Sequence, residues 1–238
     1  SEDLDIEASI NNAEVDYLLH AFNVQFPGQS ISRSDIISSW AGVRPVIGSE
    51  SAKDPSKERR DHAVWSDNGL ITVSGGKLTT FRLIALDALT AAFKYLPEAK
   101  SFTDDRVFNT PDTVPSDLIA DDPAWAQRLL GRYGSQAKAM LESAPPAERQ
   151  RITGTDFCLA ECRWAARHEA VAHLDDLLLR RTRLGMVMVH GGSELLPSLE
   201  AICTSELGWN DAQWRFEVKR YLSIWQRFYS LPEDNDRP

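Results

Sequence analysis

The fold of the first half of the chain is decided by residues 70–92, which read LITVSGGKLTTFRLIALDALTAA. The β-branched residues up to Ser74 are typical of a strand. From Leu78 onward, apolar residues recur at the spacing of one helix face. Gly75 and Gly76 stand between the two patterns, where glycine permits a tight turn. The stretch therefore predicts a strand, a turn and a helix in succession.

On its amino-terminal side, this strand is expected to have a partner. Ala63–Ser66 reads as a second strand, and Asp67-Asn68-Gly69 favours a hairpin turn between the two. Further upstream, apolar residues at helical spacing predict an amphipathic helix over residues 12–23. Residues 35–45 are expected to form another strand that delivers Arg44 to its end, because the proline that follows favours an extended residue before it.

The second half of the chain predicts only helices. Asp122 suits a helix N-cap with Pro123 at the first helical position, and Asn210 suits the cap of the last helix. The expected helices run from Pro123 to just before Gly134, and over residues 135–143, 157–180, 194–207 and 211–230. Ser193 is the expected cap of the fourth helix, and Gly208 is expected to end it.

These elements predict an α+β fold with two domains. Residues 1–96 are expected to form the first domain, with strands and a helix. Residues 97–116 are irregular and contain two prolines, which marks a linker. Residues 117–238 are expected to form a small all-α carboxyl-terminal domain.

Composition limits the classes of function. The chain has 238 residues, of which 42% are hydrophobic, so it can bury sizeable cores. Its net charge of -9 argues against a nucleic-acid partner, because binding to phosphates requires a basic surplus. Three cysteines without a CxxC pair predict neither a disulfide framework nor a metal site, and Cys158 and Cys162 are expected to pack in a core. No run approaches the roughly 20 apolar residues of a membrane helix, and a cytoplasmic environment fits the sequence best.

Three arginines form the first candidate site. Arg44 and the Arg59-Arg60 pair can converge if their strands share a sheet. Two guanidinium groups suit a phosphate dianion, because each offers paired donors and stays charged. On spacing alone, solvated surface arginines are the more common case.

The glycine turn is the second candidate. A helix start presents free N–H groups and partial positive charge, so an anion is favoured there. Lys77 adds a full charge, and Thr79 and Thr80 add hydroxyl donors. The spacing differs from that of the GxxxxGK phosphate loop, and as a bare motif a tight turn without a ligand is equally common.

Three strings follow one another along the first half of the chain. They are Trp40-Ala41-Gly42-Val43-Arg44-Pro45, Arg60-Asp61-His62 and Gly75-Gly76-Lys77-Leu78-Thr79-Thr80-Phe81-Arg82. Together they resemble the carboxyl-terminal half of FAD-dependent glycerol-3-phosphate dehydrogenases. The second half is similar to the helical domain of that family at Glu161, Glu169 and residues 176–185. The resemblance covers nearly the whole chain, and the strings are specific in combination rather than singly.

The resemblance implies a function and a set of site residues. In this family the arginines at the positions of Arg44 and Arg60 bind the substrate phosphate, whereas Arg59 has no secure counterpart. The implied reaction oxidises the C2 alcohol of glycerol 3-phosphate to dihydroxyacetone phosphate and passes a hydride to flavin N5. The helix start is expected to stabilise negative charge on the flavin ring. The residues implied to lie against FAD are Gly75, Gly76, Lys77, Leu78, Thr79 and Thr80.

The sequence departs from the family at its amino-terminal end. It lacks the GxGxxG motif for the FAD pyrophosphate and the acidic ribose-binding residue after it. It is therefore expected to begin inside a longer parent protein, whose amino-terminal FAD domain is the expected partner and holds the general base. The chain alone is expected neither to retain FAD nor to oxidise glycerol 3-phosphate. His62 is expected to hydrogen-bond locally rather than to act as the base.

Other interpretations stay open at the level of sequence. For the parent protein these include a peripheral membrane contact, with either a quinone or oxygen as electron acceptor. The chain could instead be a non-catalytic helical interaction or regulatory module. It could also derive from a related flavin oxidase of another polyol or amine, although the two phosphate-binding arginines would then have no purpose.

Overall fold

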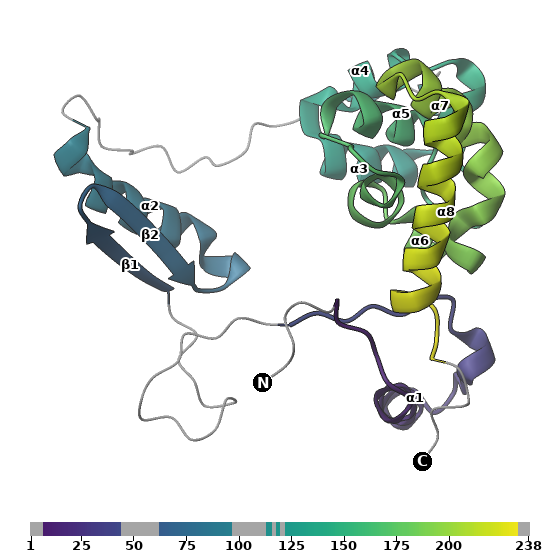
Figure 1. Cartoon of the computed structure of the whole chain (residues 1–238), viewed down its shortest axis with the longest axis horizontal. Coiled ribbons are helices and arrows are strands. Elements are labelled where there is room, and N and C mark those ends of the chain that lie inside the picture. The colour runs from purple at the N-terminus through teal and green to yellow at the C-terminus, as the bar shows by residue number, and fades with distance from the viewer. Residues whose placement is uncertain (1–6, 44–61, 97–112, 116–117, 120–121, 233–238) are drawn as a thin grey trace. The chain divides into compact units, whose positions relative to one another are not determined.

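The computed structural model describes residues 7–43, 62–96, 113–115, 118–119 and 122–232 (Figure 1). The chain divides into two compact units, residues 43–107 and the combination of residues 1–42 with 108–238. In the described ranges the regular structure is one two-stranded sheet together with helices. The predicted α+β class, with an all-α carboxyl-terminal part, is confirmed.

The smaller unit is a hairpin covered by one helix (Figure 1). Strands β1, His62–Asp67, and β2, Leu70–Gly75, pair antiparallel. Asn68 and Gly69 connect them at φ angles of 47° and 87°, as a two-residue hairpin turn that follows the twist of the strands requires. Helix α2, Phe81–Ala92, follows a 3-10 turn at Leu78–Thr80 and contacts both strands. The predicted hairpin and the helix after the glycine turn are confirmed.

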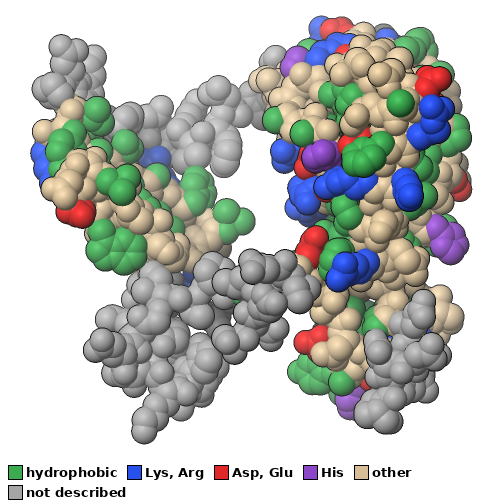
Figure 2. Space-filling model, in the orientation of Figure 1, with side chains coloured by type: hydrophobic (Ala, Val, Ile, Leu, Met, Phe, Trp, Pro, Cys, Tyr) green, Lys and Arg blue, Asp and Glu red, His purple; other side chains and the backbone are tan. Residues whose placement is uncertain are grey.

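This smaller unit has no buried core among its described residues. Every side chain from residue 62 to residue 96 is exposed or half-buried, and Figure 2 shows apolar side chains gathered over the unit. A hairpin with one helix has too little volume to enclose side chains fully. The hairpin and α2 therefore present an apolar surface, whose exposed members are Trp65, Leu70, Val73, Leu78, Phe81, Leu83, Phe93, Tyr95 and Leu96.

The larger unit begins with helix α1, Asn12–Gln25, as predicted. A reciprocal cap fixes its start, because the Asn11 side chain accepts from the Glu14 N–H and the Glu14 carboxylate accepts from the Asn11 N–H. The first of these bonds measures 2.9 Å and the second 3.0 Å. The helix ends before Phe26, whose N–H still bonds back to the carbonyl of Phe22.

The strand predicted at residues 35–45 is wrong for the part that the structure describes. Residues 36–43 carry no strand, and the segment instead bonds to helix ends far along the chain. The Ser39 N–H donates to the carbonyl of Tyr229 at 2.8 Å, and the Ser38 hydroxyl donates to that of Met186 at 2.7 Å. A single extended segment of this kind satisfies its backbone without a neighbouring strand.

These contacts place residues 1–42 in the same compact unit as the helical part of the chain. The sequence prediction grouped residues 1–96 together and drew a linker at residues 97–116. Most of that linker lies outside the described residues. The domain boundaries of the protein in solution therefore stay a prediction.

The helical part contains six α-helices in its described residues. Predicted caps are present at two of them, since the Asp122 side chain accepts from the Trp125 N–H and the Asn210 side chain from the Gln213 N–H, each at 3.0 Å. Gly208 ends α7 in the left-handed region, at φ 69°. The helices are α3, Pro123–Tyr133; α4, Ala137–Glu142; α5, Leu159–His168; α6, Leu184–Val187; α7, Leu196–Leu207; and α8, Asp211–Phe228.

The long helix predicted at residues 157–180 is interrupted. Helix α5 ends at His168, residues 169–173 are not helical, and a π-helical turn occupies Asp176–Arg181. Ala170 adopts a φ of 52°, which no helix interior accommodates, and the Asp176 carboxylate caps the new turn by accepting from the His173 N–H at 2.9 Å. The predicted cap Ser193 is also wrong, because α7 begins after Leu195 without a side-chain cap.

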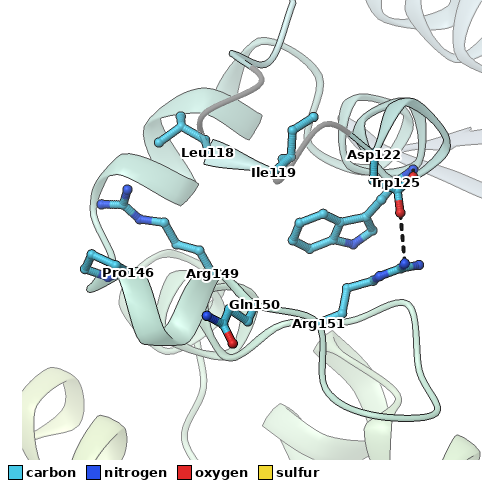
Figure 3. A pocket seen from close by; sticks show the side chains of 8 residues that line it. All are labelled: Leu118, Ile119, Asp122, Trp125, Pro146, Arg149, Gln150 and Arg151. Atoms are coloured by element: carbon cyan, nitrogen blue, oxygen red, sulfur yellow. Dashed lines mark hydrogen bonds and ion pairs between the residues drawn. The ribbon is translucent and has the colours of Figure 1, made fainter.

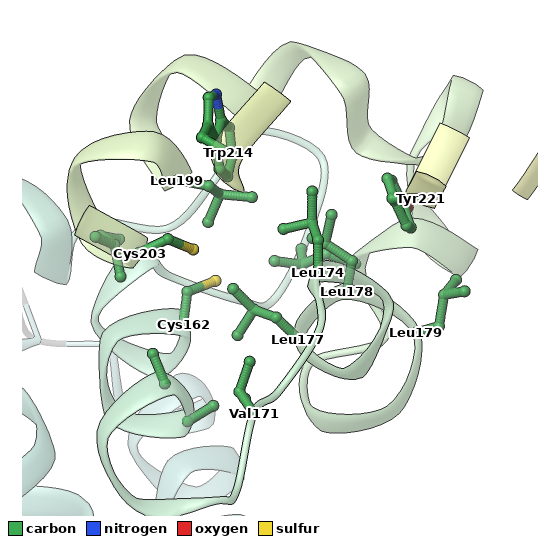
Figure 4. Packing of buried hydrophobic residues seen from close by; sticks show 14 of the residues in the cluster. Cys162, Val171, Leu174, Leu177, Leu178, Leu179, Leu199, Cys203, Trp214 and Tyr221 are labelled. Atoms are coloured by element: carbon green, nitrogen blue, oxygen red, sulfur yellow. The ribbon is translucent and has the colours of Figure 1, made fainter. Parts of the chain in front are cut away.

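Two clusters of buried side chains form the core of this unit. The first joins α5, the π-helical turn, α6, α7 and α8, and Figure 4 shows Cys162, Leu177 and Cys203 packed at its centre. The second lies around α3 and α4 and includes Cys158. Burial raises the pKa of the Cys158 thiol to about 12, so it stays protonated. The expectation that Cys158 and Cys162 pack in a core is confirmed.

A buried carboxylate lies between the two clusters. Glu161, on α5, is fully buried and accepts from the Arg128 guanidinium at 2.5 Å, the Tyr133 hydroxyl at 2.9 Å and the Cys158 N–H at 3.0 Å. The first two donors belong to α3. Because a buried charge is tolerated only when it is fully paired, Glu161 fixes α3 against α5.

Replacing Glu161 with alanine is expected to destabilise the chain by about 3–5 kcal/mol, because it leaves the half-buried Arg128 guanidinium and the Tyr133 hydroxyl without this acceptor and removes the charge that faces Arg132. Glu142→Ala is the control, since Glu142 forms an exposed pair with Lys138 worth about 0.3–0.5 kcal/mol. Urea unfolding of both variants measures the difference. Equal losses of stability in the Glu161→Ala and Glu142→Ala variants would contradict a role for Glu161 in holding α3 against α5.

The stability of the same unit is expected to fall in acid partly through Glu206. Two hydrogen bonds from Arg167, at 2.8 and 2.9 Å, and the further pair with Arg163 lower the pKa of Glu206 from 4.5 to about 2. As the pH falls, the Glu206 carboxylate is therefore protonated in the unfolded chain before it is protonated in the folded chain. The stabilisation from Glu206 is complete above pH 4.5 and is lost as the pH falls to about 2.

The measurement is the urea midpoint of the unaltered chain and of Glu206→Gln at several pH values in this window. We expect the unaltered chain to be the more stable one at pH 6, and the gap between the two to narrow steadily toward pH 2. A gap that stays constant over the window would contradict the assignment.

Candidate functional site

The glycine turn between β2 and α2 has the geometry that only glycine adopts readily. Gly75 and Gly76 have φ angles of 78° and 84°. A Cβ atom at Gly76 would lie 2.5 Å from Ile84 Cδ1 and 3.2 Å from His62 Cβ. The turn is therefore packed against α2 on one side and the start of β1 on the other. The positive φ disfavours a side chain at Gly76, and a Cβ there would have to displace the terminal methyl of Ile84.

The residues after the turn face outward. Leu78 is 87% exposed, and Lys77 and Thr79 are exposed as well. The Thr80 hydroxyl donates to the carbonyl of Lys77 at 3.0 Å, which closes the 3-10 turn before α2. The turn thus offers its backbone, the Lys77 ammonium group and the Thr79 hydroxyl on an accessible surface, at the positive end of the helix dipole.

His62 ties the strand to the helix beside this turn. Its Nε2 atom lies 2.6 Å from a carboxylate oxygen of Asp87, on α2. The local hydrogen bond expected for His62 is confirmed. The sequence did not identify Asp87 as its partner, and the only available signal was a single acidic residue within the apolar pattern of the helix. The pair holds the residue that follows Arg60 and Asp61 in a fixed position relative to the glycine turn.

The arginines Arg44, Arg59 and Arg60 lie outside the described residues. The structure therefore describes only one part of the predicted site, the turn and the helix start from Gly75 to Thr80. Convergence of Arg44 and Arg60 on that turn stays a prediction.

The described residues contain neither a membrane-spanning helix nor a metal-binding cluster. None of the described helices is both long enough and apolar enough to cross a membrane. In the same ranges, no group of three or more His, Cys, Asp or Glu side chains is placed to hold a metal ion. Even α8, with 18 residues, carries charged groups along its length.

Known proteins resemble both parts of the chain. Residues 109–214 match the family model of the C-terminal domain of alpha-glycerophosphate oxidase. Glycerol-3-phosphate dehydrogenase 2 of Mycobacterium tuberculosis is 32% identical over 227 residues, which cover 89% of this chain and 38% of that protein. The chain is similar to the glycerol-3-phosphate dehydrogenases over most of its length. It spans less than two fifths of such a relative.

Further relatives show the same similarity. A mitochondrial glycerol-3-phosphate dehydrogenase of Arabidopsis thaliana is 28% identical over 244 residues, covering 91% of this chain and 39% of that protein. The glycerol-3-phosphate dehydrogenase of Bacillus halodurans, solved in complex with FAD, superimposes with a TM-score of 0.62 at 22% identity. The superposition covers 94% of this chain and 47% of the Bacillus halodurans chain. At this identity the superposition shows a shared fold.

Replacing Gly76 with alanine is expected to destabilise the hairpin unit by roughly 2–5 kcal/mol. An alanine at positive φ costs about 1–2 kcal/mol, and the clash with Ile84 adds about 1–3 kcal/mol. Gly69→Ala is the matched control, because Gly69 has a similar φ of 87° but open space around it. Hydrogen exchange of the β1 and β2 amides measures both. Equal acceleration by the two substitutions would mean that the close approach at Gly76 does not matter.

Proposed function

We propose that this chain forms part of an FAD-dependent glycerol-3-phosphate dehydrogenase. In this proposal residues 75–80 lie against the flavin, and Arg44 and Arg60 bind the phosphate of glycerol 3-phosphate. The observation that carries the proposal is the Gly75-Gly76 turn, which places bare backbone and the start of α2 at an exposed surface. The similarity to glycerol-3-phosphate dehydrogenases along most of the chain supports it.

The described residues fit a flavin edge. Gly75 is exposed and carries no side chain, so a flat ring can approach the backbone of the turn closely. Lys77 and the positive end of α2 favour an electron-rich edge, as the reduced ring presents. When bound, FAD supplies the hydride acceptor, which no side chain provides.

Substrate orientation and proton removal are assigned to residues of this chain and of its proposed partner domain. Arg44 and Arg60 orient glycerol 3-phosphate by its phosphate, which fixes the C2 hydroxyl relative to the ring. The His62–Asp87 pair holds the strand that follows Arg60 against α2. The general base belongs to the proposed amino-terminal FAD domain. The chain alone is therefore proposed neither to retain FAD nor to turn over substrate.

The test compares the longer parent protein with its Arg44→Ala and Arg60→Ala variants, using glycerol 3-phosphate and a dye acceptor. Each variant is expected to raise KM on the order of tenfold to a hundredfold while flavin content is unchanged, because a charge-assisted bond contributes about 1.5–3 kcal/mol. Arg59→Ala, one residue from Arg60, is the matched control and is expected to leave KM unchanged.

Two outcomes would overturn the proposal in different ways. A flavin-loaded parent without activity toward glycerol 3-phosphate would refute the substrate. An active parent whose KM responds equally to all three arginine variants would refute the assignment of the phosphate ligands. The chain alone is checked by its flavin absorbance after reconstitution, and a stoichiometric yellow complex would refute the need for a partner domain.

A further inference from the structure

The helical unit contains a surface cavity of about 420 Å³ (Figure 3). Three segments line it: Leu118 and Ile119 before α3, Asp122 and Trp125 at the start of α3, and residues 146–151 after α4. Its volume lies within the range of roughly 300–1,000 Å³ that is typical of small-molecule sites. Neither the proposed reaction nor the glycine turn uses these residues.

One part of the cavity wall is apolar and fixed in place. The Trp125 side chain is only 5% exposed, and its indole N–H donates to the carbonyl of Asp156 at 2.9 Å. Its single polar group is therefore satisfied on the protein side, and the ring presents carbon to the cavity. Leu118 and Ile119 add aliphatic surface from the segment before α3 (Figure 3). This part of the wall suits a hydrocarbon or an aromatic ring.

The opposite side carries the guanidinium group of Arg149. Arg149 Nε donates to the carbonyl of Ala144 at 2.9 Å, which anchors the head of the side chain. The two terminal nitrogens have no hydrogen-bond or ion-pair partner among the described residues. Figure 3 shows Arg149 and Trp125 on opposite sides of the cavity. A half-buried guanidinium with two donors that pair with none of the described residues is suited to bind a planar anion in bidentate geometry.

The charge balance of the lining favours a monoanion. Arg151 also lines the cavity, but it pairs with Asp122 at 2.8 Å and lies 3.5 Å from a carboxylate oxygen of Asp156. Its charge is therefore neutralised within the protein, and Arg149 supplies the one unpaired positive charge among the described lining residues. One uncompensated positive charge among the described lining residues matches a monoanion better than a dianion.

We propose that this cavity binds a small carboxylate that carries an apolar body. The carboxylate pairs with Arg149, and the apolar body packs against Trp125, Leu118 and Ile119. Glycerol 3-phosphate does not fit this description, because it has a dianionic phosphate and no apolar part. The site is thus a binding site for a second class of small molecule.

The probe is 2-naphthoate, titrated into the full chain while amide chemical shifts are followed by NMR. Two analogues separate the contributions: 2-naphthylmethanol keeps the ring without the charge, and acetate keeps the charge without the ring. We expect 2-naphthoate to bind with a Kd of about 1 mM or below, and both analogues to bind at least tenfold more weakly. The shifts are expected to concentrate at residues 118–151.

Arg149→Met keeps the aliphatic stem and removes the charge, so it is expected to weaken 2-naphthoate binding about tenfold or more and to leave 2-naphthylmethanol unaffected. Arg215→Met is the matched control, since Arg215 is an exposed arginine of α8 without a described partner. Thermal melting confirms that both variants stay folded.

The proposal is overturned by any of four results. They are an absence of 2-naphthoate binding up to about 10 mM, shifts that concentrate away from residues 118–151, equal binding of 2-naphthylmethanol, or unchanged 2-naphthoate binding in Arg149→Met.

Discussion

The helical unit depends on one buried carboxylate, that of Glu161. Cys158 and Ala160, just before it on the chain, belong to the core cluster around α3 and α4. Cys162 and Ala165, just after it, belong to the cluster around α7 and α8. The charge lies where the two cores meet, so a shift of α5 that loosened one cluster would also unpair the carboxylate from Arg128. Such coupling makes the two clusters behave as one cooperative structure.

A second buried carboxylate repeats this arrangement at the other end of the unit. Glu217, on α8, is fully buried and accepts from the Leu174 N–H at 3.1 Å and from the Gln213 side chain at 3.1 Å, while His173 Nδ1 lies 3.0 Å from it. Two of these partners, His173 and Leu174, lie where the interruption between α5 and the π-helical turn ends. The carboxylate thus compensates for the backbone groups that the broken helix leaves free.

Local chemistry explains which elements the sequence predicts correctly. Three of the confirmed features depend on interactions within four residues: the Asn68-Gly69 turn, the Asp122 cap and the Asn210 cap. A short stretch of sequence is therefore enough to predict each of them. The segment at residues 36–43 and the interruption after α5 are different. Ser39 finds its acceptor at Tyr229, and the Arg181 guanidinium donates to the Glu169 carbonyl at 2.7 Å. Such partners depend on the folded arrangement, and no pattern of β-branched residues or helical spacing encodes them.

The residues of the candidate sites also differ in whether the sequence alone predicts them. Gly75 and Gly76 are predictable because their positive φ angles favour glycine at a defined point between a strand and a helix, and Gly76 also lies close to Ile84 and His62. Asp87 is not, because its partner His62 lies 25 residues away across the hairpin. The cavity beside Trp125 is less predictable still. Its lining comes from three segments of ordinary composition, and only the folded structure shows that Arg151 is paired whereas the charge of Arg149 has no partner among the described residues.

The buried core clusters and the proposed flavin contact lie on different units of this chain. The helical unit has two buried clusters and fully paired internal charges, whereas the described part of the hairpin unit buries no side chain. Yet the hairpin unit carries the glycine turn, whose backbone geometry loses the conformational freedom that glycine has in the unfolded chain. A turn that costs entropy and lies next to no core of its own requires contacts from elsewhere to hold its shape. In the proposed enzyme those contacts are the flavin and the domain that binds it, so the same surface that recognises the cofactor is also ordered by it.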